Sequence, residues 1–390
     1  MTSPPCICIF TGYYYPHFGG VEKYTASLSK FLTLNGCRVI IVTANTENAA
    51  ENETVSQVEI LRLPVLSLFK KRYPVPNFFS AGYWKLIRFI RNQDVDYYLV
   101  NTRFYITGFI GLHVASVKKK RAMLIEHGTG HLVTNNLVIN FFAAQYEHFL
   151  TAAIKKYHPV FYGVSEACTR WLSHFNIQAG GVIYNGIDTG FAAGANPFFR
   201  RHFDIPDDNL LFSAASRLIP EKGVLELVTA FERFSATHKN AHLIIAGDGP
   251  LLDSFRLRFQ NHRKIHIPGK ITYEEVMNLF GESDVVIVPS RYPEGLPTVI
   301  LEAGLAGCAV ITTDVGGASE VINSRDFGLL IKNCDESKLI SAMDELYNDE
   351  NSRKNMAKNL HEKVTRQFDW ELITRNLLNS SFFDKNHPGL

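Results

Sequence analysis

Short apolar runs alternate with longer amphipathic stretches along the sequence, and this alternation constrains the fold more than any other feature. The runs are rich in β-branched residues and are bounded by turn residues, which is typical of strands buried on both faces of a parallel sheet. Strands that alternate with helices in this way build βαβ units. We expect strands at residues 6–11, 38–43, 58–62, 97–101, 122–126, 160–164 and 182–184 in the first half, and at 210–214, 242–246, 265–267, 285–289, 309–312 and 328–331 in the second.

The alternating pattern occurs in two similar halves, which predicts two domains. A chain of 390 residues is long enough for two domains that each bury a core. The segment 185–197 between the halves is rich in Gly, Asn and Pro, which suits an interdomain connection. We therefore predict an α/β protein of two Rossmann-like, doubly wound domains that face each other across a cleft, one over residues 1–190 and the other over 191–371.

Composition argues against several classes of protein. Hydrophobic residues make up 46% and charged residues 20% of the chain, as in a soluble globular protein, and the net charge of +2 argues against a dedicated nucleic-acid-binding protein. No run is long and apolar enough to span a bilayer, and the first residues lack the basic region of a signal peptide, so we expect a cytoplasmic location. The six cysteines should then be reduced. Cys6 and Cys8 lack the second pair that a zinc site of this kind would need.

Two carboxylates follow the apolar run at 285–289. Glu294 lies in a loop with Gly295, and Glu302 lies about one turn inside the helix that Pro297 should open. Open α/β sheets bind ligands at this end of their strands, and free N–H groups at a helix start can hold a diphosphate. A carboxylate one turn into the helix can accept hydrogen bonds from ribose hydroxyls, and one in the loop can face a sugar. The alternative is that both are solvated surface residues.

A pair of cations occupies the corresponding place after the strand at 210–214. Arg217 offers a planar fork of donors and Lys222 a mobile point charge. Both suit a diphosphate that gains negative charge as a bond to it breaks. The alternative is a pair of solvated surface cations. Turns at 246–250 and 268–272 also end strands, and their residues are equally compatible with ordinary turns.

The first half carries a glycine pair and a histidine at strand ends. Gly19 and Gly20 open a helix, and glycines there let a ligand approach the backbone closely. Their spacing is not Gly-x-Gly-x-x-Gly, which argues against a dinucleotide site of the dehydrogenase kind. His127 follows the strand at 122–126 and is a candidate site residue, although a lone histidine is more often structural. Tyr15 and its two neighbouring tyrosines either line the site or simply pack.

Three of these segments resemble glycosyltransferase family 4, whose members are retaining enzymes with the GT-B fold. Residues 294–302 fit its Glu-x7-Glu signature, 216–223 fit Ser-Arg-Leu-x-x-Glu-Lys-Gly, and 16–22 fit Pro-x-x-Gly-Gly-x-Glu. The resemblance covers nearly the whole chain. It is strongest over 185–317 and weak over 45–120.

The resemblance implies a role for each candidate residue. Glu302 holds the ribose and Glu294 the donor sugar. Arg217 and Lys222 stabilise the leaving diphosphate, and His127 faces the donor sugar from across the cleft and supports the reacting centre. Further donor contacts are implied for Gly19, Gly20, Ile271, Gly295, Leu296, Pro297, Thr298 and Val299.

Expectations for the acceptor and the chain end are less specific. Tyr15 and Arg103, the latter just after the strand at 97–101, are candidate acceptor contacts. The resemblance implies that the final helix, within 372–390, crosses back to the first domain; the alternative is a simple C-terminal helix on the second. It also implies no metal and no cofactor beyond the donor, in agreement with two cations placed where a metal would otherwise neutralise phosphate.

By this resemblance the chain moves a sugar from a nucleotide-diphosphate donor to a hydroxyl of a glycan or lipid-linked acceptor, in bacterial surface-polysaccharide, lipopolysaccharide or glycolipid assembly. A UDP-sugar is the favoured donor and GDP-mannose the next. Retention follows either a front-face route or a covalent carboxylate intermediate. Two other functions remain open: a sugar-nucleotide epimerase of the same architecture, and a non-catalytic binding subunit.

Basic clusters at 70–72, 118–121 and 155–156 all fall in the first half. Anionic lipid surfaces attract such clusters at about 1 kcal/mol per cation. Peripheral contact with an anionic membrane, at its inner face, is therefore one interpretation, and solvated loop charges are the other.

Overall fold

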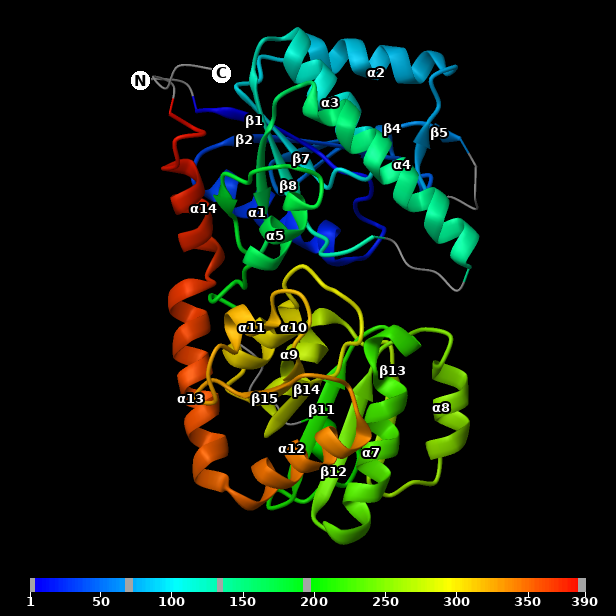
Figure 1. The fold of residues 1–390 in the computed structure, drawn as a ribbon, viewed down its shortest axis with the longest axis vertical. Helices are drawn as coiled ribbons and strands as arrows, with labels where there is room; N and C mark the ends of the chain where they lie inside the picture. Colours follow the sequence, from blue (N-terminus) through cyan, green and yellow to red (C-terminus); the bar gives the residue numbers. More distant parts are fainter. Residues whose placement is uncertain (1–3, 67–72, 132–135, 192–197, 385–390) are drawn as a thin grey trace. The chain divides into compact units, whose positions relative to one another are not determined.

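The chain folds into two compact α/β units (Figure 1). This computed structural model describes residues 4–66, 73–131, 136–191 and 198–384. The first unit comprises Met1–Asn185 with Trp370–Leu390, and the second comprises Gly186–Asp369. The boundaries thus fall at 185/186 and 369/370, whereas we expected them at 190/191 and 371/372.

The first unit is built on an eight-stranded sheet in the order β10-β9-β8-β7-β1-β2-β4-β3. All neighbouring strands are parallel except β3 and β4. The chain adds strands on one side of β1 and then returns to its other side with β7, so the topological switch point lies between β1 and β7, where open sheets bind ligands. The strands are β1 (Cys6–Phe10), β2 (Arg38–Ala44), β3 (Asn52–Val55), β4 (Val58–Leu63), β7 (Tyr97–Asn101), β8 (Arg121–Glu126), β9 (Val160–Gly163) and β10 (Gly181–Val182), with a separate antiparallel pair β5 (Val65–Leu66) and β6 (Val75–Pro76).

Helices cover both faces of this sheet, and each face has its own apolar core. One core packs the sheet against α2, α3 and α4, and the other packs it against α1 and α14. The apolar residues Trp370, Ile373 and Leu377 recur at helical spacing and form the buried face of α14. The ring of Trp370 meets that of Tyr24 at a centroid distance of 5.1 Å. The helices are α1 (Gly20–Leu34), α2 (Ala81–Asn92), α3 (Ile106–Val117), α4 (Leu137–Lys155), α5 (Glu166–Ser173) and α14 (Trp370–Leu378).

The second unit contains a six-stranded, wholly parallel sheet in the order β13-β12-β11-β14-β15-β16. Its switch point lies between β11 and β14, the two strands after which the sequence places its cations and its carboxylates. The strands are β11 (Leu210–Ala215), β12 (Ala241–Ala246), β13 (Ile265–Gly269), β14 (Val285–Val288), β15 (Ala309–Thr313) and β16 (Leu329–Ile331). The helices are α6 (Phe198–His202), the 3₁₀ helix η2 (Pro220–Lys222), α7 (Val224–Thr237), α8 (Leu252–Phe259), α9 (Tyr273–Gly281), α10 (Thr298–Leu305), α11 (Ala318–Val321), α12 (Glu336–Asn348) and α13 (Glu350–Gln367).

The predicted fold class is confirmed, since both sheets are doubly wound. The six cysteines are free thiols, and all are buried except the half-buried Cys334. Among the helices of the described residues, none is both long and apolar enough to cross a membrane.

Candidate active site

The turn between β11 and α7 brings Lys222 to the end of β14. Gly223 has a φ of 67°, in the left-handed region that favours glycine. A Cβ atom at this position would lie 2.0 Å from the carbonyl oxygen of Pro289, the residue that follows β14. Only glycine allows this close approach, which places the neighbouring Lys222 next to the loop that carries the first predicted carboxylate.

Lys222 and Glu294 form an ion pair across the switch point. The Nζ atom of Lys222 lies 2.7 Å from Oε1 of Glu294, and the Ser290 hydroxyl donates a hydrogen bond to the same oxygen. The side chains of Lys222 and Glu294 are 23% and 22% exposed, so the pair remains in contact with solvent. The three side chains share a cavity of about 20 Å³, which has room for about one water molecule. The structure thus unites a predicted diphosphate-binding cation with the predicted sugar-binding carboxylate.

Arg217, the other predicted cation, is exposed on the turn after β11. No described residue forms an ion pair with its guanidinium. The turn after β11 is fixed by the turn after β12, because the Leu218 N–H donates a hydrogen bond to the Asp248 carbonyl at 2.8 Å. A Cβ atom on Gly249 would lie 2.6 Å from the Leu218 carbonyl oxygen. Arg217 is therefore a solvent-facing cation on a well-anchored turn.

A third turn, after β15, holds the backbone of Glu294 in place. The N–H of Gly317 donates to the carbonyl of Gly295 at 2.8 Å. Gly316 has a φ of 56°, and a Cβ atom there would lie 1.7 Å from the carbonyl oxygen of Glu294. Sequence reasoning did not single out this turn. Its signal was a Gly-Gly pair just beyond the end of a predicted strand.

Glu302 lies on α10 and is only 4% exposed. Helix α10 begins at Thr298, so Pro297 occupies the N-cap position and not the first turn that we expected. Burial, together with the negative charges of Glu302 and Asp188, raises the pKa of Tyr273. Glu302 is thus a carboxylate in a poorly solvated part of the unit, where a hydrogen bond is stronger than in water.

The remaining donor-site candidates of the second unit surround the same strand ends. Leu296 is buried, whereas Thr298 and Val299 are half-buried in the first turn of α10. Ile271 is half-buried between β13 and α9. The turn that precedes it is tied to the turn after β12, because the Gly247 N–H donates to the Gly269 carbonyl at 2.8 Å.

In the first unit, His127 is held at the end of β8 by a relay of hydrogen bonds. Its Nε2 lies 3.0 Å from Oδ1 of Asn101. The amide nitrogen of Asn101 donates to the Thr25 hydroxyl at 2.8 Å, and that hydroxyl donates to the Val21 carbonyl at 2.7 Å. Since the Asn101 oxygen must accept, the proton of His127 is assigned to Nε2 and Nδ1 keeps its lone pair. Burial lowers the pKa of His127 to about 3, so the imidazole is neutral near pH 7.

The loop that carries His127 is also held from its backbone. One oxygen of Glu126 accepts hydrogen bonds from the N–H groups of His127, at 3.0 Å, and Gly128, at 2.9 Å. The other oxygen lies 2.7 Å from Nε of Arg103. Arg103 is 1% exposed and also pairs with Glu147 at 2.6 Å. The acceptor contact predicted for Arg103 needs correction, because protein groups enclose its guanidinium; in this structure Arg103 positions the Glu126 carboxylate.

The two glycines before α1 differ in the space that surrounds them. A Cβ atom on Gly19 would lie 2.3 Å from the Glu22 carboxylate, whereas one on Gly20 would meet nothing within 4 Å. Glu22 is buried, which raises its pKa, and His17 opposes this effect from 3.3 Å. Tyr15 is half-buried at this loop, and its two neighbouring tyrosines are buried and pack. A side chain at position 19 would therefore require the Glu22 carboxylate to move aside.

Comparison with known proteins identifies the family. Residues 18–191 match the family model described as glycosyltransferase family 4, and residues 196–363 match the one described as glycosyl transferases group 1. The chain belongs to the GT-B glycosyltransferases of the family 4 type. Its two units correspond to the two matches, and the Lys222–Glu294 pair lies in the second.

Two relatives match this glycosyltransferase over nearly their whole length, and a solved structure matches its fold. An uncharacterised glycosyltransferase of Methanocaldococcus jannaschii is 24% identical over 376 residues, which cover 94% of this chain and 95% of the relative. A GDP-mannose-dependent monoacylated α-(1-6)-phosphatidylinositol monomannoside mannosyltransferase of Corynebacterium glutamicum is 24% identical over 386 residues, covering 95% and 96%. The crystal structure of Anabaena HepE in complex with UDP matches with a TM-score of 0.74 at 17% identity, over 96% of this chain and 98% of HepE. This structural likeness shows that the fold is shared.

Proposed function

We propose that this glycosyltransferase transfers a sugar, with retention, from a nucleotide-diphosphate sugar to a hydroxyl. The observation that carries the proposal is the Lys222–Glu294 pair at the switch point of the second unit, with exposed Arg217 nearby in sequence. A UDP-sugar is the proposed donor and GDP-mannose the alternative, since HepE was crystallised with UDP and the C. glutamicum relative is GDP-mannose-dependent. No metal is required in this proposal, because two cations are available to the diphosphate.

The reaction follows from the charges at this site. As the bond from the sugar to the diphosphate breaks, negative charge grows on the departing phosphate, and Arg217 and Lys222 stabilise it. Glu294 orients the sugar and Glu302 accepts from the ribose hydroxyls. Lys222 and Ser290 both bind the same Glu294 oxygen, which lowers the nucleophilicity of that carboxylate. This favours a front-face route, in which the leaving phosphate takes the proton of the acceptor hydroxyl, over a covalent intermediate on Glu294.

A Glu294→Gln variant tests this assignment. The substitution keeps the size of the side chain but removes the charge, so we expect transfer to fall by at least about 100-fold, on the scale of losing one preorganised electrostatic group. Nucleotide binding, which relies on the cations and Glu302, should change little. The measurements are sugar transfer and a metal-free thermal-shift panel of UDP, GDP, ADP and their sugar conjugates.

Full activity in Glu294→Gln would remove Glu294 from the mechanism. Glu336→Gln, at a partly exposed carboxylate on α12 of the same unit, is the matched control and should retain wild-type activity. If no nucleotide shifted the melting temperature at millimolar concentration, the donor site itself would be refuted in favour of a binding subunit. Donor isomerisation without an acceptor, observed by NMR, would instead indicate an epimerase.

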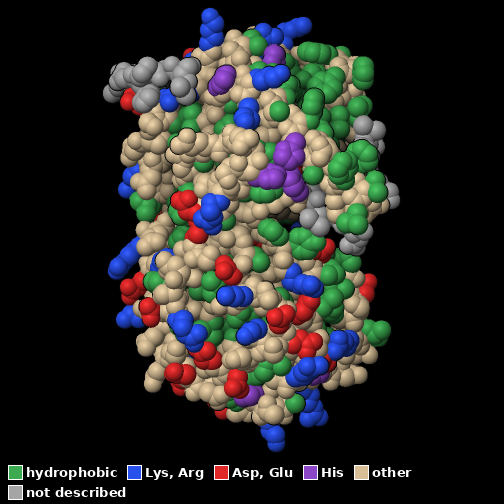
Figure 2. All heavy atoms as spheres, viewed as in Figure 1, with side chains coloured by type: hydrophobic (Ala, Val, Ile, Leu, Met, Phe, Trp, Pro, Cys, Tyr) green, Lys and Arg blue, Asp and Glu red, His purple; other side chains and the backbone are tan. Residues whose placement is uncertain are grey.

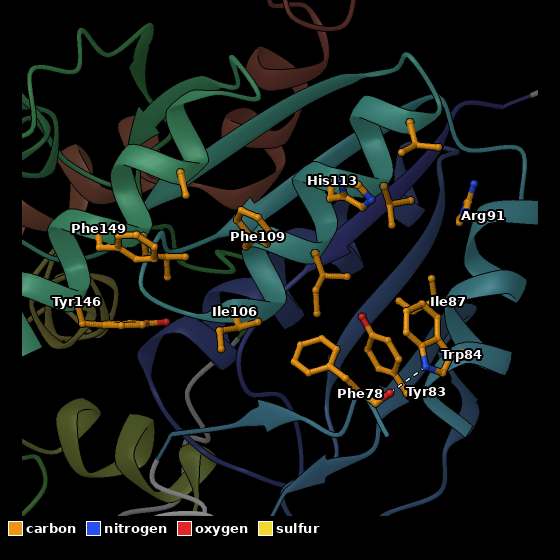
Figure 3. Close-up of a pocket in the computed structure, with 15 residues that line it drawn as sticks. Phe78, Tyr83, Trp84, Ile87, Arg91, Ile106, Phe109, His113, Tyr146 and Phe149 are labelled. Atoms are coloured by element: carbon orange, nitrogen blue, oxygen red, sulfur yellow. Dashed lines mark hydrogen bonds between the residues drawn. The ribbon is translucent and has the colours of Figure 1, made fainter. Parts of the chain in front are cut away.

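The acceptor class is indicated by an apolar pocket in the first unit. The pocket has a volume of about 520 Å³ and lies among α2, α3 and α4 (Figure 3). Its wall is almost entirely apolar, with Trp84 and Phe149 on opposite sides of the close-up and Phe109 between them. A cavity of this size and polarity suits a hydrocarbon chain better than a glycan.

The surface around the pocket is also apolar and cationic. Leu137, Phe142 and Phe149 of α4 are 84%, 64% and 74% exposed, and Figure 2 shows hydrophobic side chains gathered on this unit. The only carboxylate within α2, α3 and α4 is Glu147, which is buried and paired with Arg103. Helix α2 adds three exposed cations at Lys85, Arg88 and Arg91. Exposed apolar groups beside cations are typical of a surface that binds anionic lipid.

The basic clusters noted in the sequence contribute less to this surface than the cations of α2. Arg121 donates to the carbonyls of Ser381 and Asp384, and Lys155 donates to that of Phe175. The cluster at 70–72 lies outside the described residues. We therefore assign peripheral membrane contact to α2 and α4, and propose a lipid-linked acceptor whose hydrocarbon chain enters the pocket.

Vesicle flotation with Phe149→Ser tests the acceptor proposal. Removing this exposed ring should lower recovery with anionic vesicles by at least about threefold, given about 25 cal/mol per Å² of apolar surface that would otherwise be buried. Leu257→Ser, at a leucine that is 72% exposed in the second unit, is the matched control and should float like the wild type. Equal recovery of both variants, or no flotation of the wild type at low salt, would refute the membrane surface.

A further inference from the structure

Three histidines of the first unit converge on one point outside the proposed donor site. His131 follows β8, His148 lies on α4, and His174 is the C-cap residue of α5. Nε2 of His174 lies 3.3 Å from Nε2 of His131 and 3.3 Å from Nε2 of His148. One potential ligand atom from each histidine lies within 4.8 Å of the others. In the described residues this is the only such group of three metal-binding side chains.

Hydrogen bonding among the histidines cannot satisfy both contacts. Nδ1 of His131 bonds to the Glu147 carboxylate and so carries the proton, which leaves a bare lone pair on its Nε2. If Nε2 of His174 carries a proton and donates it to that lone pair, the same nitrogen has no lone pair with which to accept a hydrogen bond from His148. If His174 instead accepts from His148, two lone pairs face each other at His131. A cation among the three nitrogens removes this conflict.

The distances and the surrounding groups fit a zinc ion. Zinc binds imidazole nitrogen at about 2.0–2.1 Å in tetrahedral sites, which separates two ligating nitrogens by about 3.3–3.4 Å. The His174–His131 and His174–His148 separations match this value, and the ligand atoms of His131 and His148 lie within 4.8 Å of each other. Glu147 behind His131 reproduces the carboxylate–histidine–metal arrangement that fixes the tautomer of a ligand. Trp171 stacks on His174 with a centroid distance of 4.7 Å and holds its ring.

The cluster is connected to the loop that carries His127. Glu147 pairs with Arg103, Arg103 pairs with Glu126, and Glu126 accepts the N–H groups of His127 and Gly128. A metal ion bound to His131 would hold one end of the 127–131 segment, and Glu126 already holds the other end. We propose that His131, His148 and His174 bind Zn²⁺, and that the bound ion rigidifies this segment. The consequence for transfer rests on the proposed role of His127, whereas zinc binding itself does not.

Zinc titration of the full chain tests the binding site. The protein is purified without a polyhistidine tag, treated with EDTA and titrated with Zn²⁺ by calorimetry. We expect one equivalent of zinc per chain and a rise in melting temperature. His174→Ala, which removes an exposed ligand, should weaken zinc binding by more than about tenfold, and Glu147→Gln by about 10–100-fold. His113→Ala, at an exposed histidine of the same unit, should bind zinc like the wild type.

The absence of saturable binding, or an unchanged affinity in His174→Ala, would overturn the site. Because Glu147 is buried, its variant is interpreted only if it folds, and the exposed His174 provides the independent test. Hydrogen exchange then tests the rigidity: zinc should slow exchange of the 127–131 amides in the wild type and not in His174→Ala. Bound zinc with unchanged exchange would overturn that second part. Zinc binding in a protein that binds no nucleotide would refute the proposed function and leave the metal site standing.

Discussion

At the scale of single residues, candidate catalytic residues differ from positioning residues in whether other protein groups enclose their side chains. Arg217 is exposed and Lys222 partly so, as their proposed contact with a diphosphate requires. Arg103 has the same chemistry but is 1% exposed and ion-paired to two glutamates. Strand-end placement, the sequence criterion that suggested all three residues, does not report burial. The environment of the side chain therefore decides its role.

The buried His127 makes a prediction about pH. Its pKa is about 3 in the folded chain and about 6.5 when unfolded. Between these values the unfolded state binds more protons, so the free energy of unfolding falls as the pH drops below about 6.5. At pH 5 this loss amounts to about 2 kcal/mol. Because the glutamine side chain does not titrate, the His127→Gln variant should not show this loss of unfolding free energy.

The check is urea unfolding of wild type and His127→Gln at pH 7.5 and pH 5. Other histidines titrate in both proteins and cancel in the difference between them. We expect the variant to gain about 2 kcal/mol relative to the wild type on going to pH 5. Parallel pH profiles would mean that His127 is not held neutral by the fold.

At the scale of elements, the proposed donor site depends on three turns that fix one another. The turns after β11, β14 and β15 approach so closely that Gly223 and Gly316 leave no room for a side chain. Local sequence predicted the turns after β11 and β14, because Gly and Pro interrupt the apolar pattern there, and the turn after β15 was not singled out. The contacts between turns join residues far apart in the chain and follow from the strand order β11-β14-β15.

Gly316→Ala should disturb the Glu294 loop. Gly307→Ala is the matched control, because Gly307 also has a positive φ, of 79°, but a Cβ atom there would meet nothing within 4 Å. Both variants incur the left-handed backbone penalty of about 1–2 kcal/mol. Gly316→Ala should lose about 1–3 kcal/mol more through overpacking, and only this variant should lose transferase activity. The measurements are urea unfolding and sugar transfer; equal losses would show that the turn relaxes freely.

At the scale of the whole molecule, the chain passes from the first unit to the second and returns to the first with α14. The unit that carries His127 is completed only by residues near the C-terminus. Trp370 is 2% exposed. Its ring and that of His127 both pack against the ring of Tyr24, with centroid distances of 5.1 Å and 4.6 Å. The last helix is therefore part of the core beneath the histidine.

Trp370→Ala should destabilise the first unit by about 3–5 kcal/mol, the usual cost of emptying a large buried aromatic site. Trp84→Ala removes a tryptophan of the same unit that is 55% exposed, and should cost about 1 kcal/mol or less. Differential scanning calorimetry measures the loss, and hydrogen exchange of the β1 amides assigns the transition to the first unit. Exchange in β1 that is as slow as in the wild type would show that α14 is dispensable to this core.

The sequence by itself predicted every strand of the two large sheets except β3, and the candidate residues at the strand ends, because side-chain periodicity and turn residues are local properties. The strand β3 (Asn52–Val55) was not predicted, because its sequence Asn-Glu-Thr-Val is mostly polar and exposed and has no apolar pattern, as suits an antiparallel edge strand. Only the tertiary structure decided that Arg103 is enclosed, that three histidines converge, and that α2, α3 and α4 leave an apolar pocket. These features depend on packing between segments that are distant in sequence, and packing determines which polar groups are buried and paired.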